Sequence, residues 1–401
     1  MTIKRTANRP ITFSGQMAAY DKGNKESSKI IIGNSNVPKQ FTNDIVEYVQ
    51  ADPTGNPIIY TNDANVVKEH ITAWLTGWNR RKSKIVNGST AGAQTNYQMM
   101  LTVYKSTGTD TATKVYLGTN VRNDFGDVRF TKSDGTSLLN YWIESYTSGV
   151  SATIWIEIDS IPVSPGTSKI YIYYDNPLQT TTSNLDATFL ASDMTALTKV
   201  DPNNRITINS SSKVTFTHLI RNEIIYLYKS IPSTLDYRLD IEYEVTGVFF
   251  GAFDDPEVDF AGVSDTLDVL NNTTNSLYVR NYNAPLIPAY RLYMTSILSA
   301  IQNVVPHGDN YVGVQSGYIT VTRIGTTVTM YVYTDAARTI LAGTETGTVS
   351  PAIGMTYAII LSSEYDAGLT AFVNGYIQNL QLRKYASPEP TWGASGPEES
   401  D

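Results

Sequence analysis

Hydrophobic and polar residues alternate along much of the chain, which is the period of a half-buried β-strand. In "ATIWIEIDSIP" (152–162) the alternation places Ile154, Ile156 and Ile158 on one strand face. "SKIYIYYDNP" (168–177) follows after "PVSPGT", a Pro/Gly turn cluster that predicts a hairpin connection. The pattern predicts an antiparallel sandwich between Trp78 and Pro177.

A second β-rich region follows the polar segment "LQTTTSNLDATF" (178–189). "YITVTRIGTTVTMYVYTD" (318–335) predicts a hairpin with its turn near Gly325, and its inward residues are Ile319, Val321, Val328, Met330 and Val332. "YAIILSSEYDAGLTAFVNGYIQNLQLRKY" (357–385) predicts two further strands around an Asn-Gly, a strong hairpin signal. Short strands with this punctuation are typical of a sandwich or jelly roll.

The period changes within "NPIIYTNDANVVKEHITAWLTGW" (56–78). Asn62 or Asp63 can cap a helix that ends near Gly77, with an apolar stripe of Val67, Ile71, Trp74, Leu75 and Trp78. This stripe packs either on the next domain or on copies of itself in an oligomer. The residues before it are polar, with short strand-like pieces such as "KIIIG" and "DIVEYVQ".

These patterns predict an all-β protein with tandem antiparallel β-sandwiches, the second a jelly roll, and an N-terminal arm containing one short helix. We expect the arm and helix at 1–70, which serve attachment or oligomerisation, and the first sandwich at 71–180. The jelly roll spans 181–388, and 389–401 form an acidic Pro/Gly tail with no folding pattern.

Composition supports the β prediction and removes several function classes. The chain has 27 tyrosines and only 17% charged residues, a blend that fits pleated, half-buried surfaces. The net charge of -8 without a basic block argues against nucleic acid as a partner. With no cysteine, the chain can form neither disulfides nor thiolate metal sites.

Residues 78 to 177 resemble an uncharacterised β-sandwich domain, a domain of unknown function that recurs in surface proteins of archaea and bacteria and in their viruses. Three pieces carry the resemblance: "GWNRRKSKIVNGSTAGAQTNYQMMLTVY", "VRNDFGDVRFTKSDGTSLLNYWIESY" and "ATIWIEIDSIPVSPGTSKIYIYYDNP". Within the second piece, "SDGT" predicts a turn in which the aspartate bonds its own backbone. Leu138, Leu139, Tyr141 and Trp142 are expected to fill the core, so this piece is interpreted as a fold signature.

The region from about 185 to 386 resembles the concanavalin-like or laminin-G-like jelly rolls, through "GYITVTRIGTTVTMYVYTD", "FVNGYIQNLQLRKY" and "SPEPTWG". In that superfamily many members bind carbohydrate and some are glycosidases, so the resemblance implies a surface-recognition role. It carries over no catalytic residue.

The start of the chain is not followed by an apolar run, and no segment has the length and apolarity of a membrane helix. We therefore expect synthesis in the host cytoplasm without a signal peptide, no membrane insertion, and a final location in the virion. The expected function is a virion structural protein of tail-fibre or receptor-binding type, whose lectin-like C-terminal sandwich recognises a host-surface glycan or glycoprotein.

The other expected partners are virion proteins, bound through the N-terminal arm, and further copies of the chain in a homo-oligomer, with a trimer as the expected state. Three alternatives remain for the function: a capsid decoration or turret protein, a polysaccharide-degrading enzyme, and a cellular adhesin.

The candidate glycan site lies in "LYVRNYNAPLIPAYRLY" (277–293). Aromatic rings stack on sugars, and amide and guanidinium groups bond hydroxyls. The candidate residues are Tyr278, Arg280, Tyr282, Asn283, Tyr290 and Tyr293. Alternatively, these tyrosines cover sheet faces or subunit interfaces.

Catalytic patterns are incomplete, so we expect that the protein is not an enzyme and has no catalytic residue. The three histidines, His70, His218 and His307, are too widely separated to predict a metal site or a relay. "EVDFAG" (257–262) resembles a glycosidase E-x-D-x-x-E strand, but Gly262 stands where the second glutamate would be.

The expected cofactor state is none, with calcium as the alternative. The acidic run "FDDPEVDFAGVSD" offers oxygen ligands at Asp254, Asp255, Glu257 and Asp259, with Asp265 further on.

Overall fold

The computed structural model describes the backbone of 10–13, 17–20, 28–31, 38–41, 46–51, 57–61, 74–220, 223–250, 257–267, 276–284, 289–298, 301–304, 312–313, 316–349, 354–362 and 370–401. Among these residues, side chains are described from residue 74 onward, except at 281–284, 289–291, 293–298, 301–304 and 312–313. The chain divides into two compact units, Met1–Trp74 and Leu75–Asp401.

The first unit contains short antiparallel strands. One sheet has the order β1 (Pro10–Phe13), β2 (Met17–Tyr20), β3 (Ser28–Ile31), β4 (Pro38–Phe41), and a second pairs β5 (Val46–Ala51) with β6 (Pro57–Thr61). The predicted helix falls mostly on 62–73, outside the described residues, and its expected end at Gly77 is a turn with φ of 91°.

The first sandwich of the second unit consists of two four-stranded sheets. One has the order β10 (Arg129–Thr131), β13 (Thr167–Tyr174), β7 (Arg80–Asn87), β29 (Thr391–Ser400), and the other β11 (Tyr141–Thr147), β12 (Ser151–Ile161), β8 (Gln94–Tyr104), β9 (Lys114–Tyr116). Ile154, Ile156 and Ile158 lie fully buried in the core between these sheets, as the alternation predicts.

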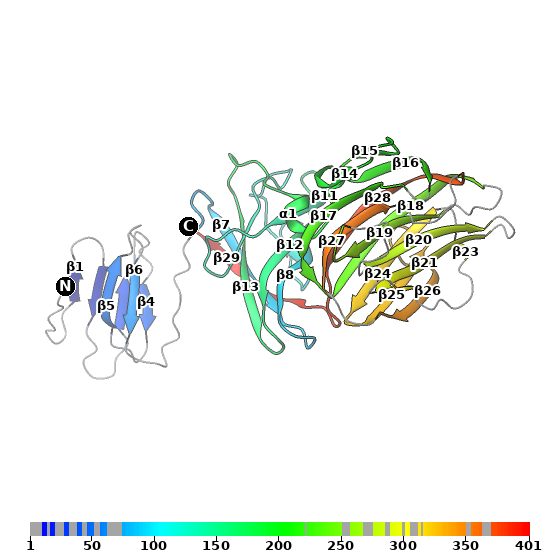
Figure 1. The fold of residues 1–401 in the computed structure, drawn as a ribbon. Helices are drawn as coiled ribbons and strands as arrows, with labels where there is room; N and C mark the ends of the chain where they lie inside the picture. Colours follow the sequence, from blue (N-terminus) through cyan, green and yellow to red (C-terminus); the bar gives the residue numbers. More distant parts are fainter. Residues whose placement is uncertain are drawn as a thin grey trace. The chain divides into compact units, whose positions relative to one another are not determined.

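Two predictions about this sandwich are wrong. "PVSPGT" does not close a hairpin, because β12 and β13 belong to different sheets and present their isoleucines to the core from opposite sides. The expected structureless tail forms β29, which pairs with β7 and lies beside it in Figure 1. Trp392 inserts into the core, and two glutamates meet arginines of β7, so the tail is fixed by the sandwich it completes.

The second sandwich packs two larger sheets face to face. The first has the order β14 (Thr198–Val200), β17 (Tyr226–Thr234), β27 (Met355–Ser362), β19 (Glu257–Ser264), β20 (Ser276–Ala284), β21 (Ala289–Leu298), β22 (Ile301–Val304), with β23 (Val312–Gly313) also on β21. The second, the seven-stranded sheet, has the order β15 (Ile206–Ser210), β16 (Lys213–Ile220), β28 (Phe372–Lys384), β18 (Tyr237–Phe249), β24 (Ser316–Ile324), β25 (Thr327–Tyr333), β26 (Leu341–Thr348).

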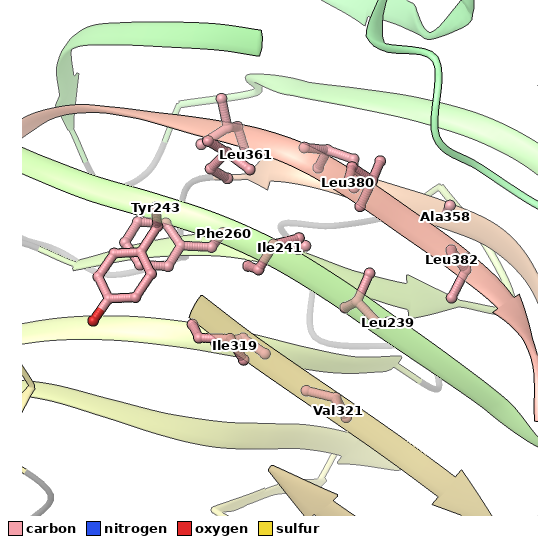
Figure 2. Close-up of a cluster of buried hydrophobic side chains, with 14 of the residues drawn as sticks. Leu239, Ile241, Tyr243, Phe260, Ile319, Val321, Ala358, Leu361, Leu380 and Leu382 are labelled. Carbon is pink, nitrogen blue, oxygen red and sulfur yellow. The ribbon is translucent and has the colours of Figure 1, made fainter. Parts of the chain in front are cut away.

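Figure 2 shows the core between these sheets, with Ile241, Phe260 and Ile319 among the apolar side chains packed there. The predicted hairpin around Gly325 is present as β24 and β25, and all five of its predicted inward residues are buried. Alternation along these strands leaves the opposite face of the seven-stranded sheet polar.

The Asn-Gly prediction is wrong, since Asn374 and Gly375 lie inside the continuous strand β28. A Cβ at Gly375 would stand 2.2 Å from the Glu244 carbonyl oxygen and 2.7 Å from the Phe216 ring. Glycine is therefore used here for close packing between strands rather than for a turn.

The two sandwiches are joined by the segment that contains α1 (Leu185–Thr188) and the 3-10 turn η2 (Met194–Ala196). They also meet at side chains: Glu389 accepts hydrogen bonds from Tyr97 (2.7 Å) of the first sandwich and from Arg383 (2.7 and 3.0 Å) of the second. Lys384 Nζ donates to the Thr95 carbonyl (2.6 Å). The described residues confirm an all-β protein built from antiparallel sandwiches.

Candidate ligand cleft

The charges of the "DFGDVRF" piece are structural. The buried carboxylate of Asp127 accepts from the backbone N–H groups of Arg122 (3.0 Å), Asp175 (2.9 Å) and Asn176 (3.2 Å). Arg129, also buried, donates to three backbone carbonyls and to the Tyr141 hydroxyl. The "SDGT" turn is formed as predicted, because Asp134 accepts from the N–H of Thr136 and of Ser137. These groups tie loops to the sandwich, and the half-exposed Asp124 of the same piece is paired with Arg122 at 2.9 Å.

A polar cleft of about 720 Å³ opens between the two sandwiches. Its walls come from β11, from the linking segment, and from the outer face of the seven-stranded sheet. The lining residues are Trp142, Glu144, Ser183, Asn184, Leu185, Ser192, Asp193, Ser211, Ser212, Asp240, Arg338, Asn379, Leu380 and Gln381. We refer to this site as the intersandwich cleft.

Trp142 and Glu144, at alternate positions of β11, form the part of the cleft wall that belongs to the first sandwich. Phe189, buried in the linking segment, packs edge-on against the Trp142 indole at 5.8 Å between ring centroids and thereby fixes it. Glu144 is exposed to solvent, yet the protein atoms packed around its carboxyl group raise its pKa, while Trp155 and Gln381 favour its charged form. Gln381 Nε2 lies 3.4 Å from Glu144 Oε1 and joins the two walls.

On the opposite wall, Asp240 stands between two guanidinium groups. Arg238 Nε lies 2.7 Å from Asp240 Oδ2, and Arg338 Nε lies 3.3 Å from its Oδ1. Arg338 has a φ of 54° in the loop between β25 and β26. Asp335 fixes this loop by accepting backbone N–H bonds from Thr339 (2.9 Å) and Ile340 (2.6 Å).

Asn379 reaches the cleft because β28 contains a bulge. Its φ is 55°, in the left-handed region that asparagine tolerates, and the register with β18 shifts nearby. The bulge lets the consecutive residues Gln378 and Asn379 both donate to the Glu242 carboxylate, at 2.6 and 2.9 Å. The cleft therefore offers an aromatic ring, amides, hydroxyls and three carboxylates against one guanidinium.

Of the predicted glycan residues, Tyr278 and Arg280 have described side chains, and neither lines this cleft. Tyr278 and Arg280 on β20 are only 3% and 2% exposed, so they lie beneath the surface. Tyr282 and Asn283 of β20 and Tyr290 and Tyr293 of β21 occupy neighbouring positions on paired strands, in a register that sets Asn283 opposite Tyr290. The side chains of these four lie outside the described part, and for them glycan contact stays a prediction.

Arg280 belongs to a buried ion cluster. Its Nε lies 2.7 Å from Asp259 Oδ1 and its Nη2 3.1 Å from Oδ2, while Nη1 lies 3.5 Å from Glu257 Oε2. A bidentate pair at this depth is a structural use of arginine. Gly262 cannot be replaced by a second glutamate, since its Cβ would stand 2.2 Å from the Leu277 carbonyl oxygen.

Calcium near this cluster also stays a prediction. Asp254 and Asp255 fall outside the described residues, and Glu257 and Asp259 face the Arg280 guanidinium. Within the described part no group of three His, Cys, Asp or Glu side chains could hold a metal ion. Of the histidines, His218 is described: it sits at a bulge of β16 and stacks on Phe372, 4.1 Å between centroids.

Sequence reasoning missed the cleft because its residues come from distant segments. One signal was available: Tyr141 and Trp142 are consecutive in a strand, so they must point to opposite faces. Tyr141 is 2% exposed in the core, whereas Trp142 faces the cleft, and Leu138 is 56% exposed. The prediction that Leu138 and Trp142 fill the core is wrong for this reason.

Comparison with known families identifies one domain. Residues 124–205 match DUF2341, a domain of unknown function. This supports the predicted uncharacterised β-sandwich domain, and the match includes β10 to β13 and the linking segment. No curated protein matches the chain.

The solved structures that match the chain do so at low similarity. A functionally unknown protein from Saccharomyces cerevisiae has a TM-score of 0.30 at 9% identity, over 48% of this chain and 98% of its own. The GH43 protein BlXynB from Bacillus licheniformis has a TM-score of 0.34 at 9% identity, over 94% of this chain and 64% of its own. A mutant of BlXynB has 0.33 at 10% identity, over 94% and 85%.

The BlXynB chains are glycoside hydrolases, and they contradict the expectation that this protein is not an enzyme; that expectation is withdrawn. Their low TM-scores assign neither an activity nor a substrate to the chain. Among the described residues no helix has the length and apolarity to span a membrane.

Proposed function

We propose that this protein is a virion structural protein of tail-fibre or receptor-binding type, and that it recognises a host-surface glycan in the intersandwich cleft. The observation that carries the recognition part is the composition of the cleft. A fixed indole stands opposite amides and carboxylates, the groups that stack on sugar faces and bond sugar hydroxyls. The virion part rests on the resemblance of the first sandwich to domains of viral and microbial surface proteins.

A glycan array probed with the full chain tests the recognition. We expect Trp142→Ala to weaken binding of the selected glycans at least about tenfold, because the ring supplies the stacking surface. Tyr146→Ala is the matched control, since Tyr146 lies on the same strand, is 54% exposed and is not among the residues that line the cleft. Equal binding by Trp142→Ala and the parent chain would contradict glycan binding in the intersandwich cleft.

Imaging of virus particles tests the virion assignment. Antibody label at the tail supports the receptor-binding type. Label spread over the capsid shell instead supports the alternative, a decoration or turret protein, and absence from particles contradicts both.

A second candidate function, polysaccharide hydrolysis, is favoured by two carboxyl groups that face one cleft from different sandwiches. Burial raises the pKa of Glu144, which suits a general acid, and Asp240 lies on the facing wall between the guanidinium groups of Arg238 and Arg338. Release of reducing ends from envelope polysaccharide would reveal this activity. Glu144→Gln should abolish it, and Asp159→Asn, which removes a carboxylate outside the cleft, should retain it.

A further inference from the structure

The outer face of the seven-stranded sheet continues the intersandwich cleft. Asp240, in the cleft wall, is paired in register with Thr320 of β24, whose hydroxyl donates to its carboxylate. Thr320 in turn pairs with Tyr331 of β25. Arg338 links the same surfaces, because its guanidinium carbon lies 5.8 Å from the Tyr318 ring centroid while its Nε contacts Asp240.

Three tyrosines form a row on this face, which we call the tyrosine row: Tyr318, Tyr331 and Tyr333. Tyr318 and Tyr333 are directly opposite on paired strands, and the rings of Tyr331 and Tyr333 stack at 6.4 Å between centroids. All three are half-buried, so each keeps part of its ring in solvent. Thr322 and Thr329 follow on the same face, and Thr329 contacts the Thr346 hydroxyl at 3.1 Å. At the edge of the row next to β18, Tyr318 pairs in register with Glu242 and lies beside the Arg338 guanidinium, so charges of both signs border the row there.

The side chains of this surface indicate which class of ligand it can bind. Rings and hydroxyls suit sugar rings, whereas the carboxylates of the cleft outnumber its one guanidinium and disfavour a polyanion. The net charge of -8 adds to this repulsion. Because the row is continuous with the cleft, a chain that enters the cleft can extend along the row.

We infer that the cleft and the tyrosine row form one extended site for a linear, uncharged polysaccharide, with several sugar units bound at once. This inference rests on the proposed function and specifies its ligand class. Several contacts along one chain add affinity with length, up to the number of units the surface holds.

Calorimetric titration of the full chain tests the inference. The probes are cello-, chito- and laminari-oligosaccharides from disaccharide to octasaccharide, with hyaluronan oligosaccharides as the anionic series. We expect at least one neutral series to gain about tenfold or more in affinity with length. The double variant Tyr331→Ala/Tyr333→Ala should abolish this gain and keep the disaccharide affinity. Tyr357→Ala, a half-buried tyrosine of the other sheet, should keep both.

The outcomes separate the two proposals. One result would overturn the extended site and leave the cleft as the binding site: Trp142→Ala loses disaccharide binding, while the double variant still gains affinity with oligosaccharide length. No binding in any neutral series, or tightest binding of hyaluronan, overturns the inference. A double variant that changes the sedimentation coefficient and keeps the length gain assigns the row to contact between copies of the chain, and this also overturns the inference.

Discussion

At the scale of single residues, the same chemical group serves structure in one place and remains available to a ligand in another. The Asp127 carboxylate is saturated by three backbone N–H groups, and the Asp259 carboxylate by an arginine. Glu144 differs, since its carboxyl group lies beside an indole and an amide and borders an open cleft. What surrounds a carboxylate, rather than its neighbours in sequence, decides its role.

Glu144 is expected to lower the stability of the fold at neutral pH. Burial raises its folded-state pKa, so the folded state binds a proton more tightly than the unfolded state. The resulting penalty is present when both states are ionised and vanishes below the ordinary carboxyl pKa of about 4.3. Thermal unfolding should therefore show Glu144→Gln to be more stable than the parent chain at pH 7, with the two converging near pH 3. A lower stability of the variant at pH 7 would contradict this.

Asp127→Ala is expected to destabilise the chain by roughly 3 kcal/mol, because buried N–H groups lose their acceptor. Denaturant unfolding measures the change in free energy. Asp159→Asn is the control: Asp159 forms an exposed ion pair with Lys132, and its removal should change stability by less than about 1 kcal/mol. Equal effects of the two substitutions would contradict the structural role of Asp127.

At the scale of elements, the strand pattern of the core follows from alternation, but the partner of each strand does not. Ile154 and Ile319 face inward as predicted, since one residue in two must face the core. Whether "PVSPGT" closes a hairpin depends on which sheet β13 joins. Whether Asn374–Gly375 forms a turn depends on how closely the Glu244 backbone approaches β28. Both are contacts with distant segments, so a local turn motif cannot predict them.

The strand β29 could not be predicted from alternation at all, because its small and polar residues have no strand pattern. Trp392 anchors it, buried in the first core, with its Nε1 donating to the Met100 carbonyl at 2.7 Å. Trp392→Ala should cost roughly 4 kcal/mol. Hydrogen exchange should then speed up at the β7 amides and stay unchanged in β24. Uniform acceleration in both sandwiches would contradict an effect confined to this strand.

At the scale of the molecule, Glu389 ties the second unit together through Tyr97 and Arg383. Burial works to raise its pKa, but hydrogen bonds and the charge of Arg383 outweigh it, and the pKa is lowered. Its contribution to stability is thus present above the ordinary carboxyl pKa and is lost as the pH falls through the folded-state value.

Glu389→Gln should accordingly lose roughly 1–2 kcal/mol at pH 7, where Arg383 is left without its charged partner. The difference from the parent chain should shrink as the pH falls below about 4. Denaturant unfolding at pH 7 and pH 3 checks both values, and a difference that is constant with pH would exclude the ion pair as the cause.

The candidate cleft, like the contact of Glu389 with Tyr97 and Arg383, could not be predicted from the sequence, because its residues are distant along the chain. Trp142, Asp240 and Gln381 are assembled by the docking of two sandwiches, and no local spacing relates them. The all-β class, by contrast, was predictable, because the strands that form the cores show the alternation of buried and exposed residues in their own sequences.

The pairing of β29 with β7 also imposes an order on biosynthesis. Asn87 and Thr391, which contact each other at the start of that pairing, are 304 positions apart. While the ribosome makes the intervening residues, β7 has an unoccupied edge and the first core has no Trp392. The sandwich that is translated first is therefore completed after the one translated second, and for that interval its open edge has to be kept from pairing with another nascent chain.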